Sequence, residues 1–213
     1  MAPRHVNKEE KTDHIARAAL VLFSEKGYRA TSVGQIARAA GIGKGTVYDY
    51  FQTKEDIFIA AVMEWLGQFE TRLAARLDGL EDPIARLKAV AQMHMDLYGD
   101  IDSNTMHLFL QIIEQSMQES GIIARRRHLV QKMAATVTRM MTGILLEGVA
   151  NGVFRPEIAS SVETIAINLH AYLDGIGLHS IVSGAYFDLK KQIDFYMDRL
   201  IRSITVSTVD KAL

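Results

Sequence analysis

The segment GIGKGTVYDYF, residues 41–51, combines glycines and a lysine that could bind phosphate with aromatic residues that are typical of a buried helix face. A phosphate-binding Walker loop requires the pattern GxxxxGK[ST] after a strand. Here Gly45 occupies the position that requires Ser or Thr, and Arg38 occupies the position of the first Gly. The element expected upstream is a helix, not a strand. The alternating glycines also fail the GxGxxG dinucleotide pattern. The segment therefore does not indicate nucleotide binding.

The tyrosines of this segment suggest a different chemistry, which is contact with the phosphates of DNA. A phenol has an apolar ring that packs and a hydroxyl that donates to a phosphate oxygen. On a helical wheel of about 100° per residue, Val47 and Phe51 lie close together and mark the buried side, and Asp49 points almost directly away from them. The outward face is small, polar and aromatic, and comprises Gly45, Thr46, Tyr48, Asp49 and Tyr50.

Metal binding is a second kind of chemistry that the histidines raise. The four histidines in question are His94, His107, His170 and His179. No pair of them has the i, i+4 spacing of a helical zinc site, and the chain contains no cysteine. We therefore expect neither a metal site nor a cofactor, although His170 and Asp174 are four residues apart and could share a hydrogen bond.

An enzyme is a third possibility to weigh. Catalysis needs a nucleophile with a base and an orienting group, or paired carboxylates in an apolar setting. Serine, histidine and aspartate residues are present, but they form no recognisable catalytic motif. A helical enzyme is therefore the less favoured alternative to a non-catalytic protein.

The composition is that of a soluble globular protein. Of the 213 residues, 48% are apolar and 23% are charged. No apolar run approaches the ~18 residues of a membrane span, and the N-terminal segment lacks the apolar core of a signal peptide, so we expect a cytoplasmic protein. Residues 1–54 carry nine Lys and Arg against five Asp and Glu, whereas the remainder is acidic. This asymmetry suggests a basic head that meets an anion.

Apolar periodicity and capping residues predict an all-α fold of about nine helices without strands. Thr31 or Ser32 should cap the second helix and Thr53 the fourth, while Ser160 and Glu163 form a capping-box pattern. The expected helices span about 8–26, 33–40, 44–50, 54–77, 104–117, 122–150, 161–182 and 189–205, and a further helix should begin at Pro83 after the cap Asp82.

Two short helices joined by a glycine-containing turn in a basic region predict a helix-turn-helix. Gly41 and Gly43 should form the turn, and Gly45 should let the backbone approach DNA. The segment TSVGQIARAAGIGKGTVYDYFQTKEDIF closely resembles the signature of the tetracycline-repressor (TetR) family of bacterial transcription regulators, and the ungapped match covers about residues 12–62.

The resemblance implies a DNA-binding domain at residues 8–54, with its motif at about 32–51, and a helical ligand-binding and dimerisation domain at 55–213. It implies a repressor that binds a near-palindromic operator as a homodimer and is released by a small, largely apolar effector. A constitutive DNA-binding regulator without an effector is the alternative. The expected DNA contacts are Thr31, Ser32, Lys44, Gly45, Thr46, Tyr48, Asp49, Tyr50 and Lys54.

The larger domain carries two further expected surfaces. A ligand pocket, on the helices that line pockets in this family, should include Trp65, Phe69, His94, Tyr98, His107, Met133, Met140 and His170. A dimer interface of four helices should include Ile165, Leu169, Tyr172, Gly175, Ile176, Ile193, Tyr196 and Leu200. The basic run Arg125-Arg126-Arg127 lies in this domain and is expected to be a solvated face rather than a second nucleic-acid site.

Overall fold

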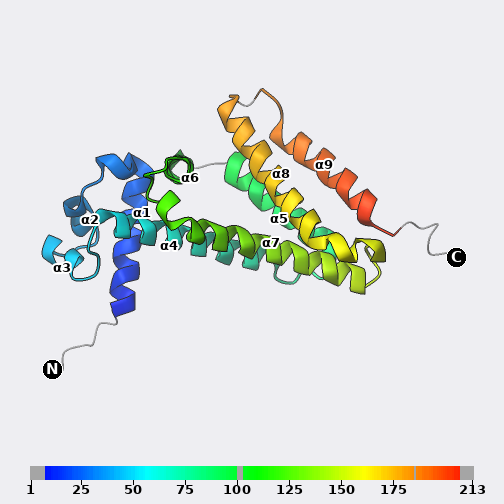
Figure 1. The fold of residues 1–213 in the computed structure, drawn as a ribbon, viewed down its shortest axis with the longest axis horizontal. Helices are drawn as coiled ribbons and strands as arrows, with labels where there is room; N and C mark the ends of the chain where they lie inside the picture. The colour runs from blue at the N-terminus through cyan, green and yellow to red at the C-terminus, as the bar shows by residue number, and fades with distance from the viewer. Residues whose placement is uncertain (1–7, 100–102, 185, 207–213) are drawn as a thin grey trace. The chain divides into compact units, whose positions relative to one another are not determined.

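The structure is a computed structural model, and it describes residues 8–99, 103–184 and 186–206, with the side chains of residues 99, 103–105 and 133 left undescribed. The described residues form nine α-helices, two 3₁₀ helices and no strand (Figure 1), which confirms the predicted all-α fold. In chain order these are α1 (Lys8–Ala30), α2 (Val33–Ala39), α3 (Lys44–Tyr48), α4 (Lys54–Leu77), α5 (Pro83–Gly99), α6 (Ser103–Met117), η1 (Ala124–Arg126), α7 (Arg127–Ala150), η2 (Pro156–Ser161), α8 (Val162–Val182) and α9 (Leu189–Ile204).

Local capping decides where several helices begin. The Ser32 side chain accepts from the backbone N–H of Gln35 while the Gln35 side chain accepts from the backbone N–H of Ser32, a complete capping box. The carboxylate of Asp188 accepts from the backbone N–H of Lys191 and so caps α9. The cap at Ser32 confirms one of the two residues that the sequence offers for the start of α2.

The capping box predicted at Ser160 and Glu163 is wrong. Residues 156–161 form the 3₁₀ helix η2, which runs directly into α8. The residue before α8 is Ser161, whose backbone is not extended (φ −124°, ψ 5°) and whose side chain makes no capping bond to the described residues. A capping box needs an extended residue before the helix, and the preceding 3₁₀ turn removes it.

The contacts divide the chain into two compact units. The first holds the described residues of 1–71 and 102–130, and the second holds those of 72–101 and 131–213. The first unit therefore contains α1 to α3 together with α6, η1 and most of α4. The predicted DNA-binding domain, residues 8–54, lies wholly inside it, and the boundary at residue 54 stays a functional proposal.

The core of the first unit is aromatic. Phe23 of α1 meets Phe58 of α4 edge to face at 5.3 Å, and Tyr28 packs on the same Phe58 ring at 5.1 Å. Phe23 and Phe58 are fully buried. Edge-to-face pairs of this kind add to the free energy gained by burying apolar area. They join α1 and α4 in the core of this unit.

In the second unit α5 contacts both α8 and α9. One close approach depends on a glycine: a Cβ atom at Gly177 of α8 would lie 2.2 Å from the ring of Tyr98 on α5. The ring therefore lies flat against bare helix backbone, and any larger residue at 177 would displace it. Among the described residues, no helix is both long and apolar enough to cross a membrane.

Candidate nucleic-acid interface

The turn between α2 and α3 is built from the glycines that the sequence singles out. Gly41 has φ +63°, a left-handed backbone that glycine adopts without steric cost. Gly43 is extended (φ −68°, ψ 148°) and precedes α3 as its N-cap. The Nε2 atom of His14 on α1 lies 3.0 Å from the carbonyl oxygen of Ala40, so α1 contacts the start of the turn. The predicted helix-turn-helix is present.

The two sides of α3 differ as the helical wheel predicts. Val47 and Phe51 are buried, whereas Lys44, Gly45 and Asp49 are exposed, and Tyr48 is 48% exposed. The helix itself is shorter than predicted and ends at Tyr48. The backbone N–H groups of residues 50 and 51 both donate to the carbonyl of Val47, so the chain continues one more turn and still buries Phe51.

Gly45 lies at the centre of this exposed face. A Cβ atom at this position would meet no described atom within 4 Å. The fold itself therefore does not require glycine at 45. Because glycine has no side chain, the backbone of α3 could approach DNA closely at this position.

Asp49 is exposed and lies at the C-cap of α3. The end of a helix carries unsatisfied carbonyl groups and a partial negative charge, so an acidic residue there is unfavourable for the helix. The helix α3 therefore gains no stability from an acid at this position, and the predicted contact of Asp49 with DNA stays a prediction.

Thr31 and Ser32, which are both predicted to contact the DNA backbone, differ in their exposure. Thr31 is only 1% exposed, and its hydroxyl donates to the carbonyls of Gly27 at 2.8 Å and Leu22 at 3.2 Å. The Thr31 side chain thus ties α1 to the start of α2, and the prediction that it contacts DNA is corrected. Ser32 is exposed and caps α2, so its position agrees with the expected contact, which stays a prediction.

Lys54, the other predicted phosphate contact, has partners inside the chain. Its ammonium donates to the carbonyls of Tyr28 at 2.8 Å and Thr31 at 2.9 Å, and it lies 4.2 Å from the centre of the Tyr28 ring. Partial burial lowers the pKa of Lys54 below its ordinary value. Lys54 therefore binds the end of α1 to the start of α4. A direct phosphate contact by this ammonium would compete with these bonds.

The helix α6 lies outside the predicted DNA-binding domain, residues 8–54, which we call the head. It contacts α1 at Gly27. Gly27 interrupts α1 with φ 83° and ψ 162°, a conformation that only glycine adopts readily. The side chain of Gln111 on α6 accepts from the backbone N–H of Tyr28 at 2.6 Å and donates to the carbonyl of Phe23 at 3.1 Å. One amide thus satisfies backbone groups on both sides of the Gly27 kink.

The basic run at 125–127 is also connected to the head. Arg125 pairs with Glu55 at 2.6 Å, and Arg126 pairs with Asp56 at 2.8 Å. Both acidic residues lie in the first turn of α4. The run was expected to be a solvated face, but two of its three arginines neutralise carboxylates. The sequence could not show this pairing, because the partners are 70 positions apart.

Of the predicted pocket residues, three gather in the second unit. The rings of His94 and His170 are 5.6 Å apart, and the Tyr98 hydroxyl donates to Asp174 Oδ1 at 3.3 Å beside them. Met140 is half-buried on α7 of the same unit. Met133 is also on α7, but its side chain lies outside the described residues.

The other predicted pocket residues belong to the first unit. Trp65 and Phe69 are buried on α4. The indole N–H of Trp65 is buried without an acceptor among the described residues. His107 is exposed, so it does not line an enclosed cavity, and that part of the prediction is corrected.

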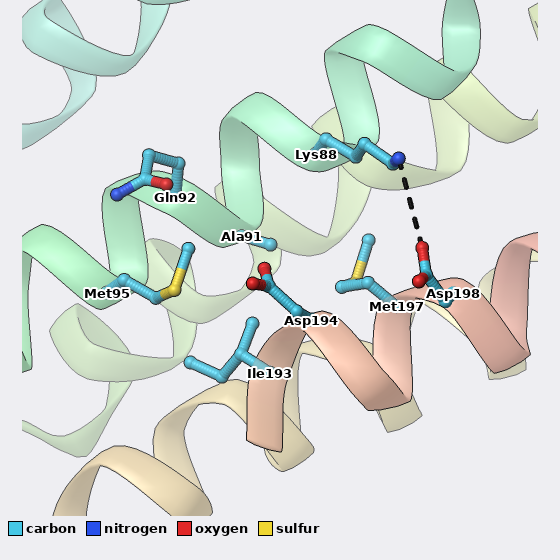
Figure 2. A pocket seen from close by; sticks show the side chains of 8 residues that line it. All are labelled: Lys88, Ala91, Gln92, Met95, Ile193, Asp194, Met197 and Asp198. Carbon is cyan, nitrogen blue, oxygen red and sulfur yellow. Dashed lines mark ion pairs between the residues drawn. The ribbon is translucent and has the colours of Figure 1, made fainter. Parts of the chain in front are cut away.

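A surface groove of about 380 Å³ lies between α5 and α9. Figure 2 shows Lys88 of α5 reaching across it toward Asp198 of α9, with their charged atoms 3.9 Å apart. Met95 of α5 and Met197 of α9 also line it, together with the charged Asp194. Its mixed charged lining differs from the apolar pocket that the sequence predicts, and it includes none of the predicted pocket residues.

The predicted dimer residues divide between the interior and the surface. Leu169 and Ile193 are fully buried inside the chain, so they are core residues and the prediction for them is corrected. The rings of Tyr172 and Tyr196 stack on each other at 3.7 Å. Ile165, Ile176 and Leu200 are half-buried, and Gly175 is exposed.

Three exposed apolar residues on these helices, Ile167 and Val182 of α8 and Phe195 of α9, are not among the predicted dimer residues. Ile167 of α8 and Phe195 of α9 both expose about half or more of their surface. Only burial in the folded chain distinguishes them from Leu169 and Ile193, which have the same apolar character.

Comparison with known proteins gives a consistent result. The sequence profile of "Bacterial regulatory proteins, tetR family" matches residues 15–61. A fatty acid metabolism regulator protein of Bacillus subtilis (strain 168) is 30% identical over 146 residues, which cover 68% of this chain and 71% of that protein. The transcriptional regulator AcrR of Shigella flexneri is 26% identical over 199 residues, covering 91% and 88% of the two chains.

A solved structure shares the fold. The fatty acid degradation regulator FadR from Bacillus halodurans superposes with a TM-score of 0.66 at 22% identity, over 90% of this chain and 94% of that one. An identity this low supports the fold alone.

Proposed function

The chain belongs to the TetR family of bacterial transcription regulators, and from this premise we propose that it is a repressor that binds a near-palindromic operator as a homodimer and leaves it when a small effector binds. The family membership makes it a ligand-responsive DNA-binding regulator and not an enzyme. The dimer, the operator and the chemistry of the effector are the proposed parts. Its place of action would be the cytoplasm.

The exposed face of α3 is the single observation that carries the DNA-binding role. A five-residue helix cannot be stable by itself, and here it is anchored through Val47 and Phe51 on its buried side. The opposite side presents Lys44, Tyr48 and the open position at Gly45. Lysine and tyrosine are suited to phosphates, and the small residue admits the edge of the groove.

The contacts of α6 and η1 suggest how the head could respond to a ligand. Gln111 binds the Gly27 kink of α1, while Arg125 and Arg126 bind the first turn of α4. Movement of α6 or η1 would therefore move the head through hydrogen bonds rather than through a flexible linker. A ligand can drive this only if it binds the DNA-free state more tightly. Recognition helices of a dimer must lie about 34 Å apart on DNA, so a small rotation costs affinity.

The effector that we would test first is a long-chain acyl compound. One similar protein, which is 30% identical, is a fatty acid metabolism regulator. The buried indole N–H of Trp65 could donate to a carbonyl or carboxylate oxygen of such a ligand. Buried apolar residues at Phe69 and nearby on α4 suit an acyl chain.

The experiment begins by selecting genomic DNA fragments that the purified chain retains, which identifies the operator. Fluorescence anisotropy then measures operator binding with and without palmitic acid, palmitoyl coenzyme A and, as a control, acetyl coenzyme A. We expect nanomolar operator binding that the long-chain compounds weaken by a factor of about 10 or more and that acetyl coenzyme A leaves unchanged.

Tyr48→Ala should lose operator affinity while its far-ultraviolet circular dichroism stays that of the wild type. Tyr48→Phe, which removes only the hydroxyl, should lose part of it. Operator binding that no ligand changes would favour the constitutive alternative. If no fragment is retained above scrambled DNA, the proposed function is wrong.

A further inference from the structure

Three side chains from α5 and α8 converge on one point in the second unit. His94 Nε2 lies 3.7 Å from Oδ1 of Asp174, and His170 Nε2 lies 3.4 Å from Oδ2 of the same carboxylate. All three groups offer a ligand atom within 4.8 Å of the others. Ligand atoms bound at about 2.0–2.2 Å around one zinc ion are about 3–3.5 Å apart. The cluster therefore has nearly the spacing of a coordination shell before any ion is added.

We propose that His94, His170 and Asp174 bind one divalent late first-row transition metal ion, of which Zn²⁺ is the representative. Two imidazole nitrogens and one carboxylate form a borderline donor set that suits zinc and its neighbours, whereas Mg²⁺ and Ca²⁺ prefer oxygen alone. The site goes beyond the proposed function and does not depend on it. Spacing along the chain does not suggest this site, because His94 and His170 are 76 positions apart and meet only in the folded chain.

The tautomer of His94 points to a cation at this place. Its Nδ1 lies 3.0 Å from the carbonyl oxygen of Val90. A carbonyl can only accept, so Nδ1 carries the proton and Nε2 presents a lone pair toward Asp174. Two acceptors then face each other across 3.7 Å, an arrangement that a positive ion between them stabilises. Hydrogen bonding of the outer nitrogen to a carbonyl also orients histidine ligands in metal sites.

Tyr98 supports the carboxylate from the other side. Its hydroxyl donates to Asp174 Oδ1 at 3.3 Å, and its ring is held against the bare backbone of Gly177. Partners that orient a ligating carboxylate in this way contribute to metal affinity.

An ion can reach the cluster and keep an open position. Asp174 is 52% exposed, and both it and His170 line a groove of about 590 Å³ between α7 and α8. Three protein ligands with an open fourth position are the pattern of zinc sites that bind water or a second molecule. The groove also contains Arg139 and Glu163, whose charges could meet such a molecule.

The test uses the full chain without a histidine tag, after treatment with a chelator. Titration with Co²⁺ is followed by its visible absorption, which reports nitrogen and oxygen ligation, and Zn²⁺ affinity is measured by competition with a chromophoric chelator. We expect one equivalent per chain, with affinity at least about tenfold weaker in Asp174→Asn and in His170→Asn. The matched control is His179→Asn, an exposed histidine of α8 that should leave binding unchanged.

Thermal unfolding distinguishes a metal site from a hydrogen-bond network. A metal site predicts that Zn²⁺ raises the Tm of the wild type and of His179→Asn but not of Asp174→Asn. If the groups form only a network, Asp174→Asn lowers the Tm by the same amount with and without Zn²⁺. That result, or Co²⁺ binding that survives in the double variant His170→Asn with Asp174→Asn, would overturn the proposal.

Discussion

At the scale of single residues, the exposed side chains of α3 differ in how they would interact with the phosphates of DNA. Lys44 and Tyr48 can donate to phosphates, whereas the carboxylate of Asp49 is repelled by them. Asp49 also lies at the negative end of α3, where it does not help the helix. A carboxylate in this position is useful if it accepts a hydrogen bond from a cytosine amino group in the major groove.

Asp49→Ala should therefore change specificity more than affinity. We expect non-specific binding to stay equal or become stronger, because a negative charge is removed from the phosphate field. Discrimination should fall by about 1–3 kcal/mol at one base pair of each half-site. Titrations against the operator, single-base variants of it and scrambled DNA measure both quantities. Equal weakening on operator and scrambled DNA would show that Asp49 does not contact a base.

Lys54 and Lys44 provide a matched pair with opposite expectations. Lys54→Met removes an ammonium that binds two carbonyls and should lower the free energy of unfolding by about 1–3 kcal/mol. Lys44→Met removes an exposed charge, so it should leave stability unchanged but reduce the salt slope of DNA binding by about one. Urea unfolding and DNA titrations at several salt concentrations test both variants. If Lys54→Met lowers the salt slope with unchanged stability, Lys54 is a phosphate contact, as the sequence predicts.

At the scale of elements, the start of α4 is where the head and η1 meet. Thr53 Oγ1 accepts from the backbone N–H of Asp56, and Asp56 accepts from the backbone N–H of Thr53, both at 3.1 Å. This reciprocal pair works as a capping box with aspartate as the acid. Arg126 adds an ion pair to the same carboxylate. The start of α4 is thus stabilised both by its own residues and by η1.

These contacts make the stability of α4 depend on pH. The hydrogen bond from the Thr53 hydroxyl, more than the pairing with Arg126, lowers the pKa of Asp56 below its ordinary 3.8. A carboxyl whose folded pKa is lowered stabilises the protein above its unfolded pKa, and this contribution is lost as the pH falls through the folded pKa. The stabilisation should therefore be complete at neutral pH and decline only below about pH 4.

Asp56→Asn should lower the free energy of unfolding by about 0.5–2 kcal/mol at pH 7. The difference from the wild type should stay constant down to about pH 5 and shrink below about pH 4. Urea unfolding at pH 7, 5, 4 and 3 measures it, and Glu81→Gln, at an exposed position beyond α4, is the control. A difference that is the same at every pH would show that the charge of Asp56 contributes nothing.

At the scale of the whole molecule, the outward side of α8 is the surface that a second copy could cover. Ile167, Ala171 and Gly175 are exposed at i, i+4 spacing. A Cβ atom at Gly175 would meet no described atom within 4 Å. Small residues along one stripe allow a second helix to approach closely, and a two-fold dimer would bring the same stripe of both copies together.

Gly175→Gln should weaken the dimer at least about tenfold without unfolding the chain. The new side chain has room in the monomer but would occupy the space that the partner helix needs. Gly143→Gln on α7 is the matched control, since that glycine is also exposed with open space around it among the described residues. Sedimentation equilibrium at micromolar concentration measures both. A wild type that is monomeric, or a Gly175 variant that dimerises as tightly as the wild type, would contradict the proposed interface.

The sequence alone determined the helices, the helix-turn-helix and the family, because these depend on neighbours in the chain. Ser32 and Asp188 cap their helices through residues three positions away. Val47 and Phe51 are four positions apart, so helical geometry places both on one side. Signals of this range are visible in any short window of residues.

The tertiary structure decided which side chains are exposed on the surface and which residues that are distant in sequence contact each other. Leu169 and Ile193 are as apolar as Ile167, but only packing between helices shows that they lie inside. Thr31 is a polar residue in the loop before α2 that proved to be buried. His94 meets Asp174 only because α5 packs on α8. Such contacts depend on how the helices pack in space, and helical spacing contains no information about partners dozens of positions away.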